Sequence, residues 1–330
     1  MRWSAVAILI PYSLSSMFTI GIDEAGYGPN LGPLVQAAAV VRSADDVDLG
    51  AALKPCVRRA DEAEDGRALI DDSKLIHVGT RGLERLERAV IGGLVGPQML
   101  GPWLERIACG TSREDLAAEP WYRADDSCPV AVEAAATDSA VPERFRACCR
   151  RHGVEWITER VVITPASRFN ALLAGLDSKA AVLGRGLITL LADVDRALPG
   201  SEPLEFVIDK QGGRAFYAPM IQTAFPDGWV TPLEESADRS VYRIDRLRRP
   251  VRLTFTPRAD GSSIVVAAAS MIAKYLREVL MRQFNQFWQD RVPNLEPTAG
   301  YPNDSKRFYG LIQRSMRELG IRADQVWRER

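Results

Sequence analysis

The sequence predicts an α/β protein built on a mixed sheet that is flanked by helices. Two apolar strand patterns come first, at 17–23 and 34–42, joined by a glycine-rich turn. Further strand patterns, at 154–164, 203–210 and 228–256, then alternate with long helical patterns. Strands that follow each other directly favour antiparallel pairing, whereas strands separated by helices favour parallel pairing. One sheet with both kinds of neighbour is therefore expected.

Helices are expected at four places, namely 80–91, 167–198, 262–288 and 305–319. Ser167 is a candidate N-cap for the second helix, because leucines follow it near helical spacing. Residues 97–150 carry scattered proline, tryptophan and cysteine with weak periodicity, which is typical of an insertion. We expect one domain over 17–330, with inserts at about 97–150 and 210–250.

Residues 1–16 are expected to lie outside this domain. The start, MRWSAVAILIPYSLSSMF, has one arginine before an apolar run, a weak likeness to a signal peptide. The run is too short to span a membrane, and no small-x-small cleavage site precedes Gly21. We interpret 1–16 as a leader, or as sequence upstream of a true start at Met17, with secretion as the less favoured alternative. No other segment predicts a membrane span.

The charge and the cysteines narrow the class of protein. A net charge of −1 excludes a global attraction to nucleic acid or to anionic membranes, so any such binding needs a local patch. The five cysteines are odd in number and form no CxxC pair. They predict reduced thiols in a cytoplasmic protein, not a disulfide framework or a zinc knuckle. His77 and His152 have no ligand-type neighbours in sequence and are expected to be surface or packed residues.

The turn GIDEAGYGPNLGP, at 21–33, combines glycines with two adjacent acids, Asp23 and Glu24. A dinucleotide-binding turn needs Gly-x-Gly-x-x-Gly, but the third position here is Leu31. The Gly-Lys-Ser/Thr of a phosphate-binding loop is also absent. A pair of carboxylates would moreover repel a phosphate. The turn therefore favours a cation site over a nucleotide cradle.

Two more acids stand where they could join Asp23 and Glu24. Asp209 ends the apolar strand EFVID, and Asp260 precedes a long helix. Each acid alone is most simply a solvated carboxylate, and Asp260 alone could be a helix cap. Together they predict four carboxylates from three elements. Hard divalent ions prefer such oxygen ligands, and a pair of ions about 3.5–4 Å apart can clamp a phosphoryl displacement.

The chain resembles the type 2 ribonuclease H family, which comprises ribonucleases HII and HIII. Residues 21–33 are similar to the family's opening G-[IV]-D-E-[AV]-G-R-G-P-x-x-G-P. Similar blocks follow in family order: DDSKLI at 71–76, FNALL at 169–173, FVIDKQGGR, ADGSSIVVAAASMIAKYLRE and AGYPNDSKRFYGLI. Asp260 stands fourteen residues before Lys274, as the fifth block requires. The blocks cover most of the chain from 17 to about 315.

The resemblance implies a ribonuclease H-like fold and a metal-dependent endonuclease. Asp23, Glu24, Asp209 and Asp260 would bind two Mg²⁺ or Mn²⁺ ions that activate water and stabilise the leaving 3′ oxygen. The implied substrate is the RNA strand of an RNA–DNA hybrid, or a ribonucleotide embedded in duplex DNA. The products would carry 5′-phosphate and 3′-hydroxyl ends. A monomer without a membrane partner is expected.

The resemblance also implies residues that bind the substrate. The backbone amides of Gly26, Tyr27 and Gly28 would face the 2′-hydroxyl, the group that separates RNA from DNA. Tyr301 would stack on the sugar at the junction. Lys74 and Lys274 would approach phosphates or the metal site. Asn170 matches the asparagine with which the long central helix of the family begins.

The chain departs from the family pattern at several positions. Tyr27 replaces an arginine, which bears on single-ribonucleotide specificity more than on metal binding. Lys210 replaces a glycine beside the third acid and could contact phosphate or partly neutralise the site. Glu278 replaces an aspartate. Arginines are concentrated in the segment 239–258, at positions 239, 243, 246, 248, 249, 252 and 258.

Alternatives remain open for this segment and for the function. The arginines could form a phosphate-tracking arm, or a solvated strand pair with salt bridges to the acidic stretch at 45–65. A divergent relative could bind nucleic acid or a partner without cleaving it, as Tyr27 and the inserts suggest. A nucleotide-binding enzyme would use the glycine turn and would not need Asp260. The complete set of four acids favours the nuclease.

Overall fold

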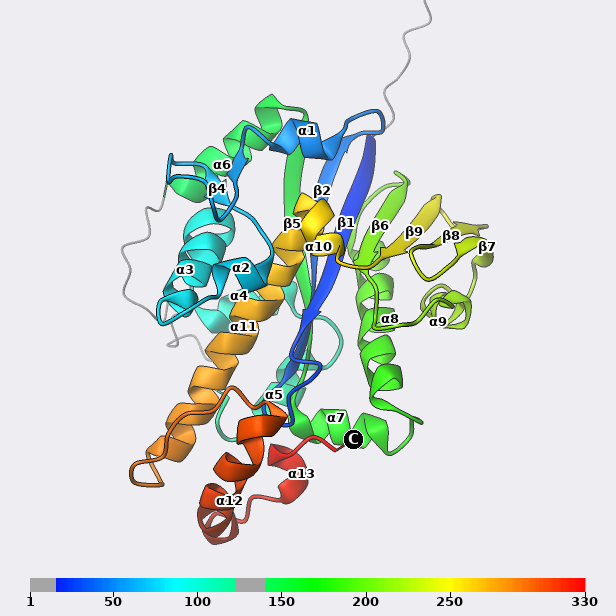
Figure 1. Cartoon of the computed structure of the whole chain (residues 1–330). Coiled ribbons are helices and arrows are strands. Elements are labelled where there is room, and N and C mark those ends of the chain that lie inside the picture. The colour runs from blue at the N-terminus through cyan, green and yellow to red at the C-terminus, as the bar shows by residue number, and fades with distance from the viewer. Residues whose placement is uncertain (1–15, 123–139, 330) are drawn as a thin grey trace, which may run out of the picture.

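The computed structural model describes residues 16–122 and 140–329, and a seven-stranded mixed sheet forms their centre (Figure 1). The strand order is β5-β2-β1-β6-β9-β8-β7. The strands are β1 (Ser16–Ala25), β2 (Leu34–Ala44), β5 (Val154–Thr164), β6 (Leu204–Asp209), β7 (Trp229–Glu235), β8 (Ser240–Asp245) and β9 (Val251–Thr256). The predicted fold class, a mixed α/β sheet flanked by helices, is confirmed.

Strand direction changes at β1. The strands β1, β2 and β5 form an antiparallel meander. The sequence predicted antiparallel pairing for β1 and β2, because these two strands follow each other directly. On its other side β1 pairs in parallel with β6, which pairs in parallel with β9. The antiparallel strands β8 and β7 extend that edge. The carboxyl ends of β1, β6 and β9 therefore meet at one edge of the sheet.

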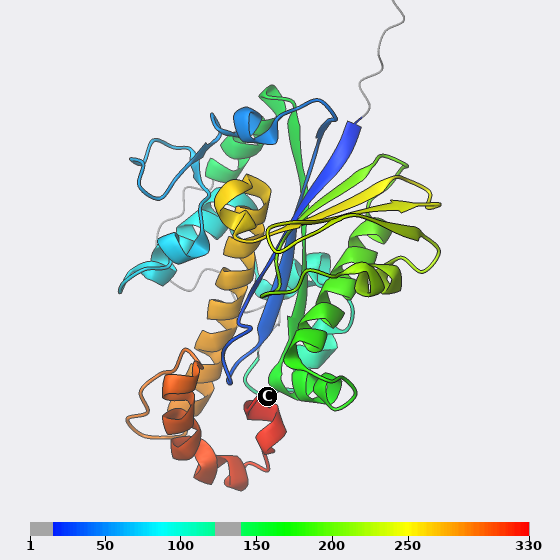
Figure 2. The ribbon, with the colours of Figure 1, turned by 45° about the vertical axis from the view of Figure 1, so that its right-hand side comes forward.

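Helices cover both faces of the central strands. Helix α11 (Ile264–Gln289) packs on one face and α8 (Lys179–Ala197) on the other (Figure 2). The alternation of β2 divides its side chains between the two cores: Ala37, Ala39 and Val41 join the α11 side, and Ala38 and Val40 the α8 side. A strand buried on both faces reads as the nearly continuous apolar run seen in its sequence.

Gly21 allows α11 to approach β1 closely. A Cβ atom at Gly21 would lie 2.3 Å from the carbonyl carbon of Val265, in the first turn of α11. The small residues that follow, Ala267, Ala268 and Ala269, are fully buried. Because the helix backbone lies directly on the strand, the start of α11 is fixed relative to the end of β1.

The segment 97–150, expected to be irregular, is helical where it is described. It forms α4 (Leu100–Ile107), α5 (Ser112–Ala117) and α6 (Val141–Arg151), and residues 123–139 lie outside the described residues. Trp103, Leu116 and Phe145 of these helices are buried in the core on the α11 side of the sheet. Helices as short as these give too few turns for a clear period, which explains the weak pattern.

The remaining short elements lie between these long ones. They are α1 (Leu49–Leu53), β3 (Val57–Arg58), β4 (Ala68–Leu69), α2 (Ser73–Ile76), α3 (Gly82–Ala89), a π-helical turn (Val90–Val95), α9 (Ala218–Ala224), α10 (Ala259–Ser262), α12 (Pro302–Glu318) and α13 (Ala323–Val326). The helices expected at 80–91, 262–288 and 305–319 correspond to α3, α11 and α12.

The single helix predicted over 167–198 is wrong, because two helices occupy this range. They are α7 (Ala166–Leu173) and α8 (Lys179–Ala197). Ser178 starts α8, and its side chain accepts a hydrogen bond from the amide of Ala181. Ser167 caps nothing; its amide and hydroxyl donate to Glu119 at 2.8 and 2.9 Å. A favourable cap inside a leucine-rich stretch was the signal for the break.

The expectation that no cysteines pair is also wrong. Cys56 and Cys148, 92 residues apart in sequence, form a disulfide between the loop after α1 and helix α6. Cys109 and Cys149 are buried free thiols, and Cys128 lies outside the described residues. Spacing could not show the pair, since only the fold brings the two segments together. The cytoplasmic location was inferred from reduced thiols, and the disulfide removes that argument.

Most of the expected leader lies outside the described residues, since residues 1–15 are not described and β1 begins at Ser16. Of the helices within 16–122 and 140–329, none combines the length and the hydropathy that crossing a bilayer needs.

The substitution Gly21→Ala should destabilise the fold strongly. Its Cβ would overlap the backbone of Val265, and backbone can yield only if the helix shifts. Overpacking of this kind costs about 1–3 kcal/mol or more. The free energy of unfolding, measured by urea denaturation, should fall by at least this amount.

The matched control is Gly310→Ala in the middle of α12, where no atom lies within 4 Å of the added Cβ. Alanine should raise stability there by about 0.5–1 kcal/mol, because glycine is unfavourable inside a helix. Equal effects of the two substitutions would contradict the close helix–strand contact.

Candidate metal centre

The four predicted acids come together at the carboxyl edge of the parallel strands. Ile22 of β1 pairs with Ile208 of β6, so Asp23 and Asp209 occupy the next positions of adjacent strands. Asp209 in turn pairs with Thr256 at the end of β9, from which a short turn leads to Asp260 in α10. The topology thus joins residues that are far apart in sequence.

Asp23 and Glu24 are carboxylates in a poorly solvated position. Asp23 is 8% exposed, and its Oδ1 accepts a hydrogen bond from the amide of Glu24 at 2.7 Å. Burial is the main cause that raises the pKa of Asp23, and repulsion from Asp209 and Asp260 adds to it. Burial, then repulsion from Asp23 and Asp209, likewise raises the pKa of Glu24. Ionising this pair together therefore needs a cation nearby.

A serine side chain also hydrogen-bonds to Asp23. The hydroxyl of Ser270, on α11, hydrogen-bonds to the carboxylate and also lies 3.0 Å from the hydroxyl of Ser73. The close packing of α11 on β1 brings Ser270 to this position. Ser73, at the start of α2, is thereby connected to the acids.

Asp209 and Asp260 are fixed by backbone amides. The Oδ1 of Asp209 accepts from the amide of Ala259 at 2.8 Å, and burial raises its pKa. Arg258 adopts a left-handed φ of 56°, which turns the chain between β9 and α10 so that this amide reaches Asp209. Asp260 is 3% exposed and accepts from the amide of Gly261 at 3.0 Å. Ser263, not Asp260, caps the long helix α11.

The chemistry of these donors suits hard divalent ions. All four ligands offer carboxylate oxygens, the type that Mg²⁺ and Mn²⁺ prefer. Within the described parts of the chain, no three of these acids have oxygens that all lie within 4.8 Å of one another. Their spacing thus does not form a compact cage for one ion.

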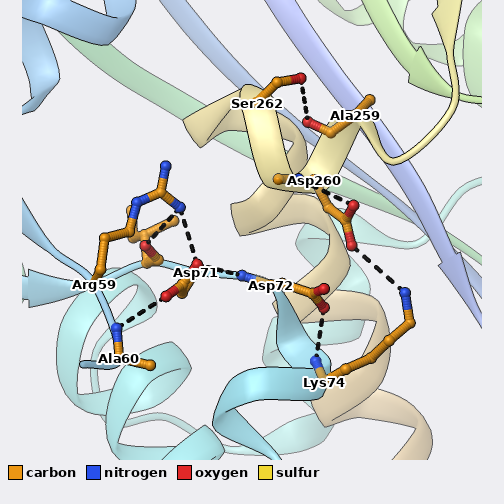
Figure 3. A network of polar contacts seen from close by, with 10 residues as sticks. Arg59, Ala60, Asp71, Asp72, Lys74, Ala259, Asp260 and Ser262 are labelled. Atoms are coloured by element: carbon orange, nitrogen blue, oxygen red, sulfur yellow. Dashed lines mark hydrogen bonds and ion pairs between the residues drawn. The ribbon is translucent and has the colours of Figure 1, made fainter.

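Lys74 is the cation that the structure places beside this cluster. Its Nζ lies 3.7 Å from Oδ2 of Asp260, while most of its side chain is exposed (Figure 3). Asp72 caps the first turn of α2 by accepting from the amide of Lys74 at 2.8 Å. Asp71 accepts from the amide of Asp72 at 2.9 Å and from Nη1 of Arg59 at 3.1 Å. Arg59, Asp71, Asp72 and Lys74 thus form a continuous set of polar contacts, called the polar frame below, that holds Lys74 beside the acids.

The turn after the acids requires glycine at Gly26. It adopts a φ of 89°, and a Cβ there would lie 2.5 Å from Nε of Arg277 and 2.6 Å from the carbonyl oxygen of Pro33. Tyr301 lies across the turn, where its ring is 3.9 Å from the Cβ that Gly28 would carry. Tyr301 is 47% exposed, so one side of its ring is open to solvent beside the glycine turn.

The C-terminal segment supports this turn from behind, which the sequence did not predict. The fully buried Arg328 donates from Nη2 to the carbonyl oxygens of Gly26, at 2.7 Å, and of Pro29. Its amide donates to the carbonyl of Asn30 at 2.8 Å. Burial, reinforced by the neighbouring Arg277, lowers the pKa of Arg328. The carbonyl groups of Gly26 and Pro29 point to Arg328, so Arg328 fixes the turn from the side that faces the protein interior.

Asn170 holds the same segment. Its side-chain amide donates to the carbonyls of Asp324 and Trp327, both at 2.8 Å, and its oxygen accepts from the amide of Glu329 at 2.9 Å. Both N–H donors and one acceptor position of the side chain are therefore used within the protein. The structure connects Asn170 to the glycine turn through the tail, and not directly to the four acids.

Lys274 and Tyr27 also have internal partners. Nζ of Lys274 donates to Glu278, one turn further along α11, at 2.6 Å. Tyr27 is half-buried against the small cluster that contains Leu34 and Phe169. Tyr27 therefore packs under the turn where the family pattern has arginine.

Lys210 does not neutralise the acids, although it follows Asp209 directly. It is 7% exposed, and its Nζ donates to the carbonyls of Ser236 at 2.6 Å and Ala237 at 3.1 Å. These bonds hold the loop between β7 and β8. The segment after Lys210 instead presents Phe216, which is 70% exposed and was not singled out in the sequence.

The arginines of 239–258 serve mainly to join neighbouring elements. The ion pairs are Arg239–Glu234, Arg243–Asp245, Arg248–Asp195, Arg249–Asp195 and Arg252–Glu205. Arg249 is also buried against three carbonyls, those of Leu198, Pro199 and Gly200. The structural alternative is thus favoured for this segment, but its acidic partners are not those of 45–65.

The comparisons with known proteins concern structure alone. No family model and no curated protein matches the chain. The chain is similar to ribonuclease HII from a complex with PCNA from Archaeoglobus fulgidus, at 14% identity over 95% of both chains, with a TM-score of 0.41. It is similar to ribonuclease H2 from Pyrococcus horikoshii OT3, at 14% identity over 94% of this chain and 92% of the other, with a TM-score of 0.42.

A third match is the Bst ribonuclease HIII in complex with Mn²⁺. Its identity is 18%, it covers 96% of this chain and 67% of the other, and its TM-score is 0.41.

The stability of the metal-free protein should fall as the pH rises from about 4 towards 7. Asp23 has a pKa of about 7 in the folded chain and an ordinary pKa of 3.8. Over this range the folded state holds a proton that the unfolded state has lost, so each increase in pH favours unfolding. Urea denaturation in EDTA at several pH values measures the effect.

The variant Asp23→Asn should flatten this pH dependence, because it removes one of the two carboxyl groups whose pKa is raised most. Mn²⁺ should raise the midpoint of wild-type unfolding more at pH 7.5 than at pH 5. An unchanged pH profile in the variant would contradict the assignment.

The substitution Arg328→Met should loosen the glycine turn. It removes the donors to Gly26 and Pro29 and leaves both carbonyls without that partner, at a cost of about 1–3 kcal/mol. Hydrogen exchange of the amides in 26–31 should become faster. The control Arg322→Met changes an exposed arginine of the same segment, which pairs only with Asp324 near it in sequence. Faster exchange in the control alone would refute the role of Arg328.

Proposed function

We propose that this protein is a metal-dependent endoribonuclease that cleaves the RNA strand of RNA–DNA hybrids, or ribonucleotides embedded in duplex DNA. The observation that carries the proposal is the convergence of Asp23, Glu24, Asp209 and Asp260 at one sheet edge, beside a glycine turn. Retention of all four acids favours cleavage over the alternative of a relative that only binds.

The four carboxylates would hold two Mg²⁺ or Mn²⁺ ions. Bound there, such ions supply an activated water and stabilise negative charge on the scissile phosphate and the leaving 3′ oxygen. The protein contributes ligands fixed by amides of Ala259 and Gly261 and by Ser270. The products would carry 5′-phosphate and 3′-hydroxyl ends.

The glycine turn would distinguish RNA from DNA. Backbone amides of Gly26, Tyr27 and Gly28 would face the 2′-hydroxyl, the group that DNA lacks. Arg328 supports this role because it binds carbonyls of the turn on the inner side. Tyr301, with an exposed ring beside Gly28, would stack on the sugar.

Two further side chains would contact the nucleic acid. Lys74 lies at the acids with an exposed stem and would bind a phosphate near the cleaved bond. Phe216, exposed in the segment that begins at Asp209, would stack on a base. Because the arginines of 239–258 are mostly paired internally, these local contacts replace the long phosphate-tracking arm as the expected binding surface.

The direct test is cleavage of labelled duplexes in Mg²⁺ or Mn²⁺ by the wild type and by Asp23→Ala. The variant should lose at least about a hundredfold in cleavage rate, since it removes charge stabilisation of the reacting phosphate. Duplex binding in EDTA should stay nearly unchanged. Asp61→Ala, which alters an exposed acid outside the site, should cleave like the wild type.

Two duplexes separate the substrate alternatives. One is a continuous RNA–DNA hybrid, and the other carries a single ribonucleotide in DNA. With Tyr27 in place of arginine, we expect the hybrid to be the better substrate. Folded wild-type protein that cleaves neither duplex with either metal would refute the nuclease.

A further inference from the structure

A second cluster of reactive side chains lies away from the four acids. It contains Cys56, in the loop after α1, Cys148 on α6, and His152, which directly follows the last residue of α6. The two cysteines are bonded, with 5.5 Å between their Cα atoms, a separation at which disulfides form readily. Nδ1 of His152 lies 3.8 Å from each sulfur. None of these three residues belongs to the blocks that carry the family resemblance.

The surroundings of the pair favour exchange of the disulfide over permanent burial. Cys56 is 2% exposed, whereas Cys148 is half-buried and His152 is exposed. One sulfur is therefore within reach of a thiol from solvent, while the other is protected inside the protein. A disulfide with one accessible sulfur is more labile than one that is buried on both sides.

The imidazole supports a disulfide more than a metal site. Nδ1 of His152 lies 3.0 Å from the carbonyl oxygen of Cys148. A carbonyl only accepts hydrogen bonds, so this contact favours the tautomer in which Nδ1 carries the hydrogen. The N–H that lies beside both sulfurs can instead stabilise a thiolate formed there.

We propose that Cys56 and Cys148 form a reversible thiol–disulfide exchange site with His152 as the group that stabilises the thiolate. A thiolate of a small dithiol attacks Sγ of Cys148, the bond between the cysteines breaks, and Cys56 leaves with the electron pair. The second sulfur of the dithiol then attacks its own mixed disulfide and releases Cys148. The protein gains two electrons and two protons, and the dithiol becomes a cyclic disulfide.

The exchange site is connected to the DDSK motif through the short pair of strands β3 and β4. The carbonyl of Cys56 accepts from the amide of Ala68, at the start of β4. Three residues after Cys56, Arg59 pairs with Asp71, which continues to Asp72 and Lys74 (Figure 3). Opening the disulfide removes the covalent bond between α6 and Cys56, which lies three residues before Arg59, the first residue of the polar frame. The effect on the frame does not depend on the proposed nuclease function.

Differential alkylation of the full-length protein tests the exchange. Protein purified without reductant is treated with N-ethylmaleimide before and after dithiothreitol, and its peptides are mapped by mass spectrometry. We expect the Cys56 and Cys148 peptides to be linked, to separate in dithiothreitol, and to link again with glutathione disulfide. The oxidised form should melt at least about 5 °C above the reduced form, since the bond closes a long loop.

Matched variants exclude a general effect of cysteine loss. Cys148→Ser should abolish the difference in melting temperature between oxidising and reducing conditions, whereas Cys149→Ala, which alters a free thiol on the same helix, should keep it. Each protein is compared with itself, so a lower stability of either variant does not affect the result. Cys56 and Cys148 that stay open to alkylation in glutathione disulfide would overturn the proposal. So would one zinc ion per wild-type chain that is lost in Cys148→Ser.

Hydrogen exchange tests the connection to the frame. Reduction should speed exchange of amides in 68–76 severalfold in the wild type and leave Cys148→Ser unchanged. Equal exchange in the oxidised and reduced wild type would overturn this part of the proposal.

Discussion

The parallel pairing of β1 with β6, and of β6 with β9, is the constraint on which the site depends. This pairing ends three strands at one edge and brings Asp23 beside Asp209, with Asp260 one short turn beyond. Burial and mutual repulsion then disfavour the ionised acids, as the raised pKa values of Asp23, Glu24 and Asp209 show. A fold that places these charges together needs cations to ionise them near neutral pH.

The rest of the structure keeps this edge in place. Gly21 lets α11 lie on β1, and the same helix carries Ser270 to Asp23. The C-terminal segment reaches back to the glycine turn through Arg328, and Asn170 anchors that segment. Lys74 is held beside the acids by the polar frame.

Much of this architecture could be predicted from the sequence, because its signals are local. Strand patterns marked β1, β2, β5 and β6 one by one and gave a single range, 228–256, for β7, β8 and β9. The acids and glycines of 21–33 indicated a cation site. Features that depend on distant contacts could not be predicted. The bond between Cys56 and Cys148, the tail at Arg328 and the acidic partners of the arginines all join segments that only the fold brings together. Asn170 was found by its motif, but its contacts with the tail needed the structure.

The central claim is that the four acids bind a pair of divalent ions. Anomalous diffraction from crystals of the wild type soaked in Mn²⁺ tests this most directly. The account predicts two peaks at the carboxyl edge of the sheet, both within bonding distance of oxygens of Asp23, Glu24, Asp209 or Asp260. The variant Asp209→Asn should lose at least one of them. Peaks elsewhere on the protein with none at this edge, in crystals that hold the folded wild type, would contradict the account.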